Sequence, residues 1–308
     1  MRSSRPVSTP PQPNRPLVGI AWMLVTGICF VAVTAIVKHL GDSVPPAQAA
    51  FLRYLLGLVF LIPMIGAMRA ARLDSWSVKL LLFRGVIHSA AVALWFFSMA
   101  RITIAEVTAL NYLAPIYVTL GAAVFLGEKL ALRRLAAIAV ALGGAMIILR
   151  PGFRALDPGH FAMMATAIFM GGSYLIAKHM SGQTSASVIV GFLSITVTIG
   201  LAPLAFAVWV PVSFGDLVWL FVVAAFATLG HYTMTLSFAA APVAVTQPVT
   251  FLQLLWATLI GIFVFLEPAD RWVLIGGTVI LGAVCFITWR ETMLKRKVIA
   301  PPSVATKT

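Results

Sequence analysis

Charged residues are scarce in this sequence. Asp, Glu, Lys and Arg together make up 10% of its 308 residues, while hydrophobic residues make up 61%. In average globular chains about a quarter of the residues are charged. A water-soluble protein of this length, which would form about two domains, does not fit this composition. The sequence instead predicts an integral membrane protein that is embedded in the lipid bilayer.

Carboxylates are rarer still, with nine Asp and Glu against 22 Lys and Arg, and the net charge is +13. No Asp or Glu falls plainly in the middle of an apolar run, which argues against a carboxylate proton relay. Facilitated diffusion and proton exchange both remain open as the mode of transport. The basic residues lie in the tails and in short connections, as is typical of membrane anchoring, and not on a phosphate-binding face. We therefore expect no nucleic-acid partner.

Cysteine is nearly absent, because only Cys29 and Cys285 are present and both lie inside apolar runs. They form no CxxC pair and no Cys/His spacing for a metal, so we interpret them as buried packing thiols. The sequence also contains no HExxH, no GxSxG and no cluster of carboxylates. We expect no catalytic residue, no metal and no cofactor, so the protein is predicted not to be an enzyme.

Long apolar runs dominate what is present. Each is about as long as a helix that crosses the hydrocarbon core of a bilayer. The first run follows a tail, residues 1–16, that is rich in Pro, Ser and Arg and that we expect to be disordered. This first run has the length of a retained helix and not of a cleaved signal peptide. Ten runs can be marked, at about 17–38, 46–68, 77–99, 104–126, 132–149, 158–180, 186–210, 215–239, 244–266 and 270–290.

The distribution of basic residues predicts the orientation. When the N-terminus is placed in the cytoplasm, most Lys and Arg at the ends of the runs, and the basic tail 291–308, lie on the cytoplasmic side. This is the bias that orients membrane proteins. We expect a multi-pass protein of the cell inner membrane with both termini in the cytoplasm.

An internal repeat organises the chain. The stretch that begins at Ser98 and looks like a membrane hairpin recurs from Ser237, 139 residues later, and Lys38-His39 recurs as Lys178-His179. Residues 17–149 and 158–290 are therefore two copies of five helices, and because five is odd the copies insert in opposite orientations. Inverted repeats are common in secondary transporters. The alternative is that the duplication serves packing alone.

The first copy resembles a known family. A central Pro115, a Leu-Gly-Glu-Lys turn at 126–129 and the pair Gly143-Gly144 are similar to the EamA domain of the drug/metabolite transporter superfamily. The second copy departs from that pattern, with Leu254 at the position of the proline and Leu266-Glu267-Pro268 at the turn. The resemblance implies alternating-access movement of a small-molecule substrate across the inner membrane.

Within that family the chain looks most like bacterial riboflavin or S-adenosylmethionine carriers. The likeness rests on the residue types at Arg84-Gly85, at Trp95-Phe96-Phe97 and in the segment 111–115. An exporter of amino acids, drugs or toxic metabolites is the alternative. A channel and a non-transporting membrane assembly protein are further alternatives.

Polar side chains inside the apolar runs are the candidate binding residues, because such a group is costly in lipid unless it faces a partner or a wet cavity. Arg84 or Arg53 would attract an anionic or carbonyl-bearing substrate. Pro115 would free a backbone carbonyl in the fourth helix. An amide fixes the orientation of a planar polar ligand and an indole supplies stacking area. We predict that a central cavity is lined by Arg84, His88, Trp95, Asn111, Tyr112, Tyr174, His231, Gln247, Gln253 and Trp256.

Each of these predictions has a structural alternative. Arg84 could extend along its helix to the cytoplasmic surface, and Trp95 could be an interface anchor. His88 and His231 could relay protons or could be hydrogen-bonded core groups. Hydrogen bonds between helices would explain the amides. Small residues would allow close contact between the two repeats or in a homodimer, and they are Gly143, Gly144, Gly276, Gly277 and Gly282.

Overall fold

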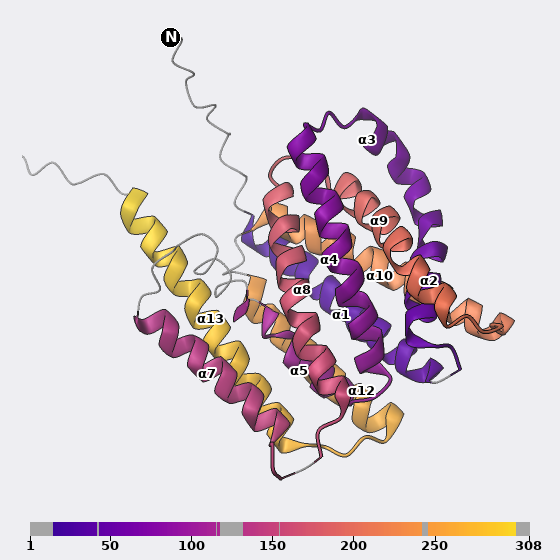
Figure 1. Ribbon diagram of the computed structural model, residues 1–308. Helices are drawn as coiled ribbons and strands as arrows, with labels where there is room; N and C mark the ends of the chain where they lie inside the picture. Colours follow the sequence, from indigo (N-terminus) through magenta and orange to yellow (C-terminus); the bar gives the residue numbers. More distant parts are fainter. Residues whose placement is uncertain are drawn as a thin grey trace, which may run out of the picture.

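A computed structural model describes residues 15–41, 43–114, 116–117, 132–153, 155–241 and 246–299. The described residues form ten helical segments in chain order (Figure 1), which confirms the predicted all-α fold. The first five are α1 (Pro16–Leu40), α2–η1–α3 (Pro46–Gly57, Leu58–Met64, Ile65–Ala70), α4 (Ser75–Met99), α5 (Ile104–Asn111) and α7 (Leu132–Leu149). The second five are α8 (Pro158–Met180), α9 (Ala186–Ala207), α10 (Phe214–Ala240), η2–α12 (Gln247–Thr250, Phe251–Phe265) and α13 (Arg271–Ile299).

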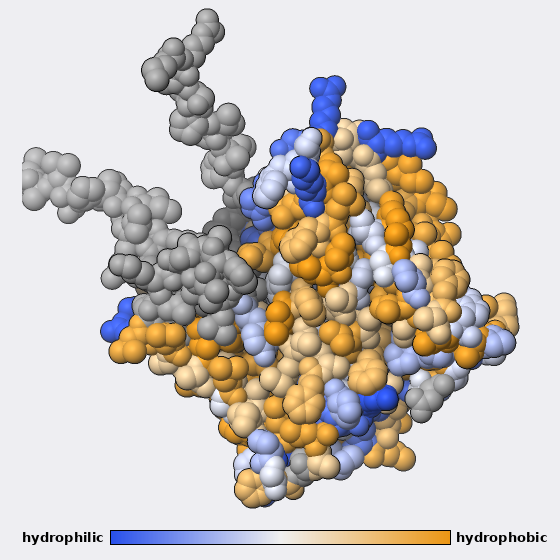
Figure 2. All heavy atoms as spheres, in the orientation of Figure 1, coloured by the Kyte–Doolittle hydropathy of each residue, from blue (hydrophilic) through white to orange (hydrophobic). Residues whose placement is uncertain are grey.

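Six of these segments are long and apolar enough to cross a membrane, and three shorter apolar helices accompany them. Large apolar side chains such as Phe83, Ile199 and Phe263 point out of the protein. Figure 2 shows apolar residues over most of the visible face, with hydrophilic residues mainly toward its upper and lower edges. This pattern suits a lipid-facing surface with polar ends.

Helix boundaries follow from local chemistry. Asp74 caps α4 by accepting a hydrogen bond from the Ser77 backbone N–H at 3.1 Å, and Thr103 and Glu106 form a reciprocal capping box at the start of α5. Such side chains satisfy backbone donors that a helix start leaves unpaired. Pro63 lies inside the 3₁₀ turn η1, where its missing N–H interrupts the α-helical pattern.

The end of the last helix differs from the sequence estimate. The apolar pattern predicts an end near residue 290, but α13 continues to Ile299. The helix therefore runs through the first part of the basic segment 291–308. Periodicity in apolar residues ends where the helix leaves the apolar environment and does not mark where helical hydrogen bonding ends.

The packing of helices follows the repeat. Helix α1 packs on α10 and α4 packs on α8, which are equivalent pairs when the two copies are exchanged. The Ser98 hydroxyl at the C-terminal end of α4 donates to the Gly159 carbonyl at the start of α8, at 2.9 Å. Helix α8 therefore begins at the end of the bundle where α4 finishes. Lys38, near the C-terminus of α1, lies at this same end, so α1 and α8 run in opposite directions, as an inverted repeat requires.

The small residues of the last helix in each copy serve the contact between the copies. Helices α7 and α13 lie side by side (Figure 1). A Cβ atom on Gly144 would lie 2.8 Å from the Gly276 carbonyl oxygen, and one on Gly276 would lie 2.5 Å from the Gly144 oxygen. Around Gly143 and Gly282, in contrast, no described atom would be within 4 Å of an added Cβ. Gly144 and Gly276 thus belong to the interface between the repeats.

Candidate functional site

Polar side chains from both repeats gather in the interior of the bundle. Their helices are α2, α4 and α5 of the first copy and α8 and α10 of the second. The buried side chains of these helices are mostly apolar, with several Ser and Thr besides this group, and polar groups at such depth are costly unless they face a partner or a wet cavity. We call the group the central cluster, and it consists of Arg53, Tyr54, Arg84, His88, Asn111, Ser173, Tyr174 and His231.

Arg84 is fixed across three helices. Its Nε donates to the Ser173 carbonyl and hydroxyl oxygens, each at 3.2 Å, and its Nη1 donates to the Ile189 carbonyl at 3.1 Å. The side chain is only 1% exposed. Arg84 therefore does not extend to the cytoplasmic surface, and that structural alternative is wrong. Its charge is held inside the bundle.

The two predicted histidines lie against each other. The His88 and His231 ring centroids are 5.1 Å apart, and His88 Nδ1 shares a hydrogen bond of 2.9 Å with the Ser173 hydroxyl. The Phe30 ring lies 5.2 Å from His231 and 6.2 Å from Trp95. Trp95 is buried beside this aromatic layer, so it is not an anchor at the membrane surface.

Arg53 adds a second buried cation. It is 2% exposed, and its guanidinium carbon lies 3.8 Å from the centre of the Tyr54 ring. Both Arg53 and Arg84 are close enough to Tyr54 and Tyr174 for electrostatic interaction. Among the residues that the structure describes, no carboxylate lies within ion-pair distance of either arginine. Two buried positive charges without an acidic partner are rare in proteins.

Several polar atoms of the central cluster have no hydrogen-bond partner, although almost none of their surface is exposed. Leaving such an atom unpaired costs about 1–3 kcal/mol, and more when the group is charged. Tyr54 lies beside Arg53, and Asn111 lies beside Tyr174. The unpaired atoms are Arg53 Nε and Nη2, Tyr54 Oη, Arg84 Nη2, His88 Nε2, Asn111 Oδ1 and His231 Nδ1.

Other predicted residues lie outside the central cluster. The Tyr112 hydroxyl donates to the Thr250 carbonyl at 2.6 Å and so joins α5 to η2. Gln253 and Trp256 line a separate small pocket between α1 and α12, together with Met23 and Gly27. The Gln247 side chain, Pro115, Thr119 and the predicted turn at 126–129 fall outside the described residues.

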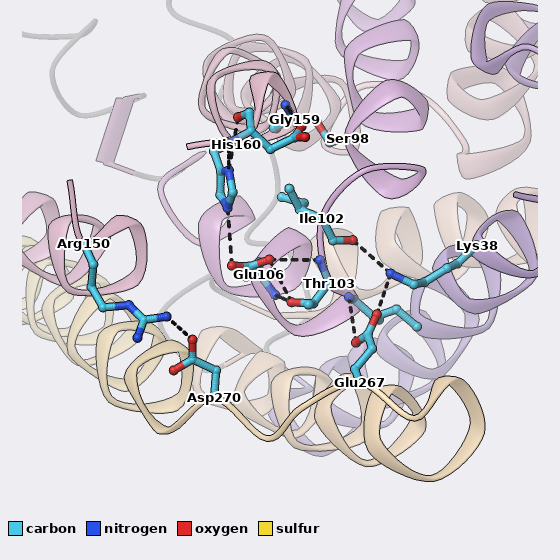
Figure 3. Close-up of polar contacts among 12 residues, drawn as sticks. Lys38, Ser98, Ile102, Thr103, Glu106, Arg150, Gly159, His160, Glu267 and Asp270 are labelled. Atoms are coloured by element: carbon cyan, nitrogen blue, oxygen red, sulfur yellow. Dashed lines mark hydrogen bonds and ion pairs between the residues drawn. The ribbon is translucent and has the colours of Figure 1, made fainter. Parts of the chain in front are cut away.

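One end of the bundle is closed by ionic contacts. Figure 3 shows Lys38 of α1 and Glu267, which follows α12, pointing toward each other, and their charged atoms are 2.5 Å apart. Lys38 also donates to the Ile102 carbonyl at 3.1 Å, and Glu267 accepts from the Ile104 N–H at 3.3 Å. Two further side-chain contacts lie at this end (Figure 3), a hydrogen bond of 3.3 Å between Glu106 and His160 and an ion pair between Arg150 and Asp270.

The opposite end repeats part of this arrangement. Lys178, the equivalent of Lys38, donates to the Ala241 carbonyl at 3.3 Å and to the Phe238 carbonyl. Ser237, the equivalent of Ser98, donates to the Gly19 carbonyl at 2.8 Å. The repeated Lys and Ser of the sequence are thus hydrogen-bond donors that hold matching helix ends together. The equivalent of Glu267 is Glu128, which lies outside the described residues.

The candidate site therefore differs in part from the set predicted from sequence. Arg84, His88, Asn111, Tyr174 and His231 come together, and Trp95 lies next to them. Arg53, the second arginine inside an apolar run that the sequence singles out, is also a member of the central cluster. Two members were not predicted, Tyr54 and Ser173. Tyr54 and Ser173 carry no comparable signal, since either residue is common in helices.

A helical membrane bundle with an inverted repeat and a buried polar cluster between the repeats is the architecture of a secondary transporter. The model of the EamA-like transporter family matches residues 17–150 and 157–289. The chain therefore belongs to the EamA-like transporter family.

Curated relatives extend over nearly the whole chain. A riboflavin transporter of Rhizobium johnstonii is 30% identical over 96% of this chain and 99% of its own length. A riboflavin transporter of Vibrio cholerae is 28% identical over 92% and 97%, and an S-adenosylmethionine uptake transporter of Rickettsia felis is 22% identical over 89% and 94%. A solved crystal structure with 19% identity, which covers 93% of this chain and 99% of its own, matches with a TM-score of 0.57 and shows the fold alone.

Proposed function

We propose that this protein moves riboflavin or a closely similar metabolite across the bacterial inner membrane by alternating access. The observation that carries the proposal is the central cluster, where buried polar atoms without a protein partner converge from both repeats. Groups of this kind gain free energy when a ligand supplies the missing hydrogen bonds. A binding site between two inverted halves can face either side in turn.

The two ends of the bundle support a mechanism with alternating openings. Lys38 and Ser98 bind helix ends at one end, and Lys178 and Ser237 bind the equivalent helix ends at the other. A rigid-body movement of one half against the other would break one set while keeping the second. The positive-inside bias supports an orientation with the Lys38 end on the periplasmic side and both termini in the cytoplasm.

The choice of riboflavin rests on similarity. Two riboflavin transporters match over more than nine-tenths of the chain, at 30% and 28% identity. The S-adenosylmethionine uptake transporter is less similar, at 22%. Export is the alternative direction, because a pseudopaline exporter of Pseudomonas aeruginosa is 24% identical over 60% of this chain.

The test is uptake of labelled riboflavin by cells of a riboflavin auxotroph that lacks its own importer. We expect saturable uptake that depends on the protein and that shows counterflow when the cells are preloaded with unlabelled riboflavin. Non-saturable uptake without counterflow would indicate a channel instead. Normal membrane expression without transport of riboflavin in either direction would overturn the proposal.

A further inference from the structure

We infer that Arg53 and Arg84 form a paired donor site that binds the oxygen acceptors of a planar ligand without net positive charge. This inference rests on the proposed transport function and defines the substrate class of the same site. It goes further because it assigns recognition to two named side chains. It also separates the two substrate classes found among the relatives, riboflavin and S-adenosylmethionine.

The two guanidinium groups face a common place. They belong to neighbouring helices, α2 and α4, and each interacts electrostatically with both Tyr54 and Tyr174. Arg84 is held by bonds to Ser173 and Ile189 but keeps Nη2 free. Arg53 keeps both Nε and Nη2 free. Three buried N–H-bearing nitrogens are therefore available to a ligand.

The chemistry of these nitrogens selects the ligand. A guanidinium group has donors only and remains charged, and its planar fork matches carbonyl, carboxylate or phosphate oxygens. A ligand that presents several carbonyl or anionic oxygens would satisfy all three nitrogens. The free ring nitrogens of His88 and His231 provide one or two further contacts. Tyr54, Phe30 and Trp95 add aromatic surface beside them, which favours a flat ring.

The charge of the site excludes cations. Among the described residues the two arginines have no acidic partner, so no nearby negative charge compensates their field inside the bundle. S-adenosylmethionine has a sulfonium and an ammonium group against one carboxylate, so it would be repelled by its net positive charge although its carboxylate could bond to a guanidinium. Riboflavin is uncharged and carries two ring carbonyls, so it belongs to the class that the site accepts.

The opposing interpretation is that both arginines are structural. The two interpretations differ for Arg53, because a structural arginine has partners in the ligand-free protein and Arg53 has two unpaired nitrogens. Replacing a buried charge that lacks partners by an apolar residue of similar length is neutral or stabilising. Removing a charge that holds a structure together is destabilising.

The experiment uses the full chain in lipid nanodiscs and compares wild type with Arg53→Met and Arg84→Met. The matched control is Arg101→Met, which changes an exposed arginine that stacks on Phe97 at 4.0 Å. Thermal melting is recorded without ligand and with riboflavin or S-adenosylmethionine. Binding of riboflavin is measured by quenching of its fluorescence.

We expect ligand-free Arg53→Met to melt at the wild-type temperature or above it, and to bind riboflavin at least tenfold more weakly. Arg84→Met should melt lower, since it loses its bonds to α8 and α9, and Arg101→Met should bind as wild type does. A lower melting temperature for Arg53→Met, or protection of the wild type by S-adenosylmethionine, would overturn the inference. If wild type does not bind riboflavin, the proposed substrate fails, while the melting of ligand-free Arg53→Met still decides the role of the arginine.

Discussion

At the scale of single residues, burial without partners is the feature that defines the site. Most polar side chains in these helices bond to a carbonyl one turn back, as Thr34 does to Phe30 and Thr108 to Ile104. The central cluster is different, because Arg53, His88 and His231 each keep an unpaired atom in the interior. A protein retains such atoms at a free-energy cost, and under the proposed function the binding of a ligand offsets that cost.

A substitution at Asn111 tests whether the unpaired buried atoms serve ligand binding. Its Oδ1 is buried, unpaired and next to Tyr174. Replacement by leucine keeps the number and branching of the side-chain heavy atoms and removes the acceptor and donors. We expect Asn111→Leu to lower riboflavin uptake about tenfold, the value of one buried hydrogen bond, while the amount of protein in the membrane is unchanged.

Gln253 provides the comparison. It lines a pocket between α1 and α12 that is separate from the central cluster. We expect Gln253→Leu to lower transport, but by less than Asn111→Leu does. Parallel uptake assays at equal expression measure both, and an equal or larger effect of Gln253→Leu would move the binding site toward α12.

At the scale of elements, the repeat interface and the closed end depend on a few contacts. Gly144 and Gly276 allow α7 and α13 to approach until each glycine meets the backbone of the other. Lys38 and Glu267 join α1 to the segment after α12. The first contact is between packed backbones and the second is ionic, so they respond differently to substitution.

A larger side chain at the glycine contact should destabilise the fold. Gly144→Leu places carbon atoms where the Gly276 carbonyl and Ile280 lie. We expect a loss of about 1–3 kcal/mol, visible as a lower melting temperature in detergent. Gly143→Ala is the control, because its Cβ would meet no described atom within 4 Å and alanine favours a helix. Equal melting of the two variants would contradict the assigned interface.

The ionic contact between Lys38 and Glu267 should control the opening of the end of the bundle at which it lies. Glu267→Gln removes the charge that faces Lys38 and keeps the size of the side chain. We expect this end to open more often, so that a cysteine placed at Ile104 reacts faster with a polar maleimide added outside the cell. The double variant Lys38→Glu, Glu267→Lys restores the pair and should slow the reaction again. Unchanged labelling in Glu267→Gln would show that the pair does not hold the end closed.

At the scale of the whole molecule, the distribution of charge predicts the topology. The chain has 22 Lys and Arg but nine Asp and Glu, and most of the basic residues at helix ends fall on one side. We expect reporters fused to the N-terminus and the C-terminus to give cytoplasmic signals in a bacterium. A periplasmic signal from both termini would reverse the orientation and would place the Lys38 end in the cytoplasm.

The sequence by itself determined the class and the plan of the protein. Long apolar runs require helices in a bilayer, because only internal hydrogen bonding satisfies the backbone there. The recurrence of Lys38-His39 and Ser98 in the second half was enough to predict two copies, and an odd number of helices in each copy requires inversion. These properties depend only on the composition of the chain and on the order of its residues, so they can be predicted without a structure.

Only the tertiary structure decided which polar residues meet. Arg53 and Arg84 are far apart in sequence from Ser173 and His231, and no periodicity brings α2 and α4 against α8 and α10. Likewise, the repeated Lys and Ser are visible in the sequence, but their acceptors are backbone carbonyls of other helices, and any residue can supply a carbonyl. The packing of the helices decides which side chains meet across the bundle. It places Gln253 outside the central cluster, although its amide is chemically suited to a binding site.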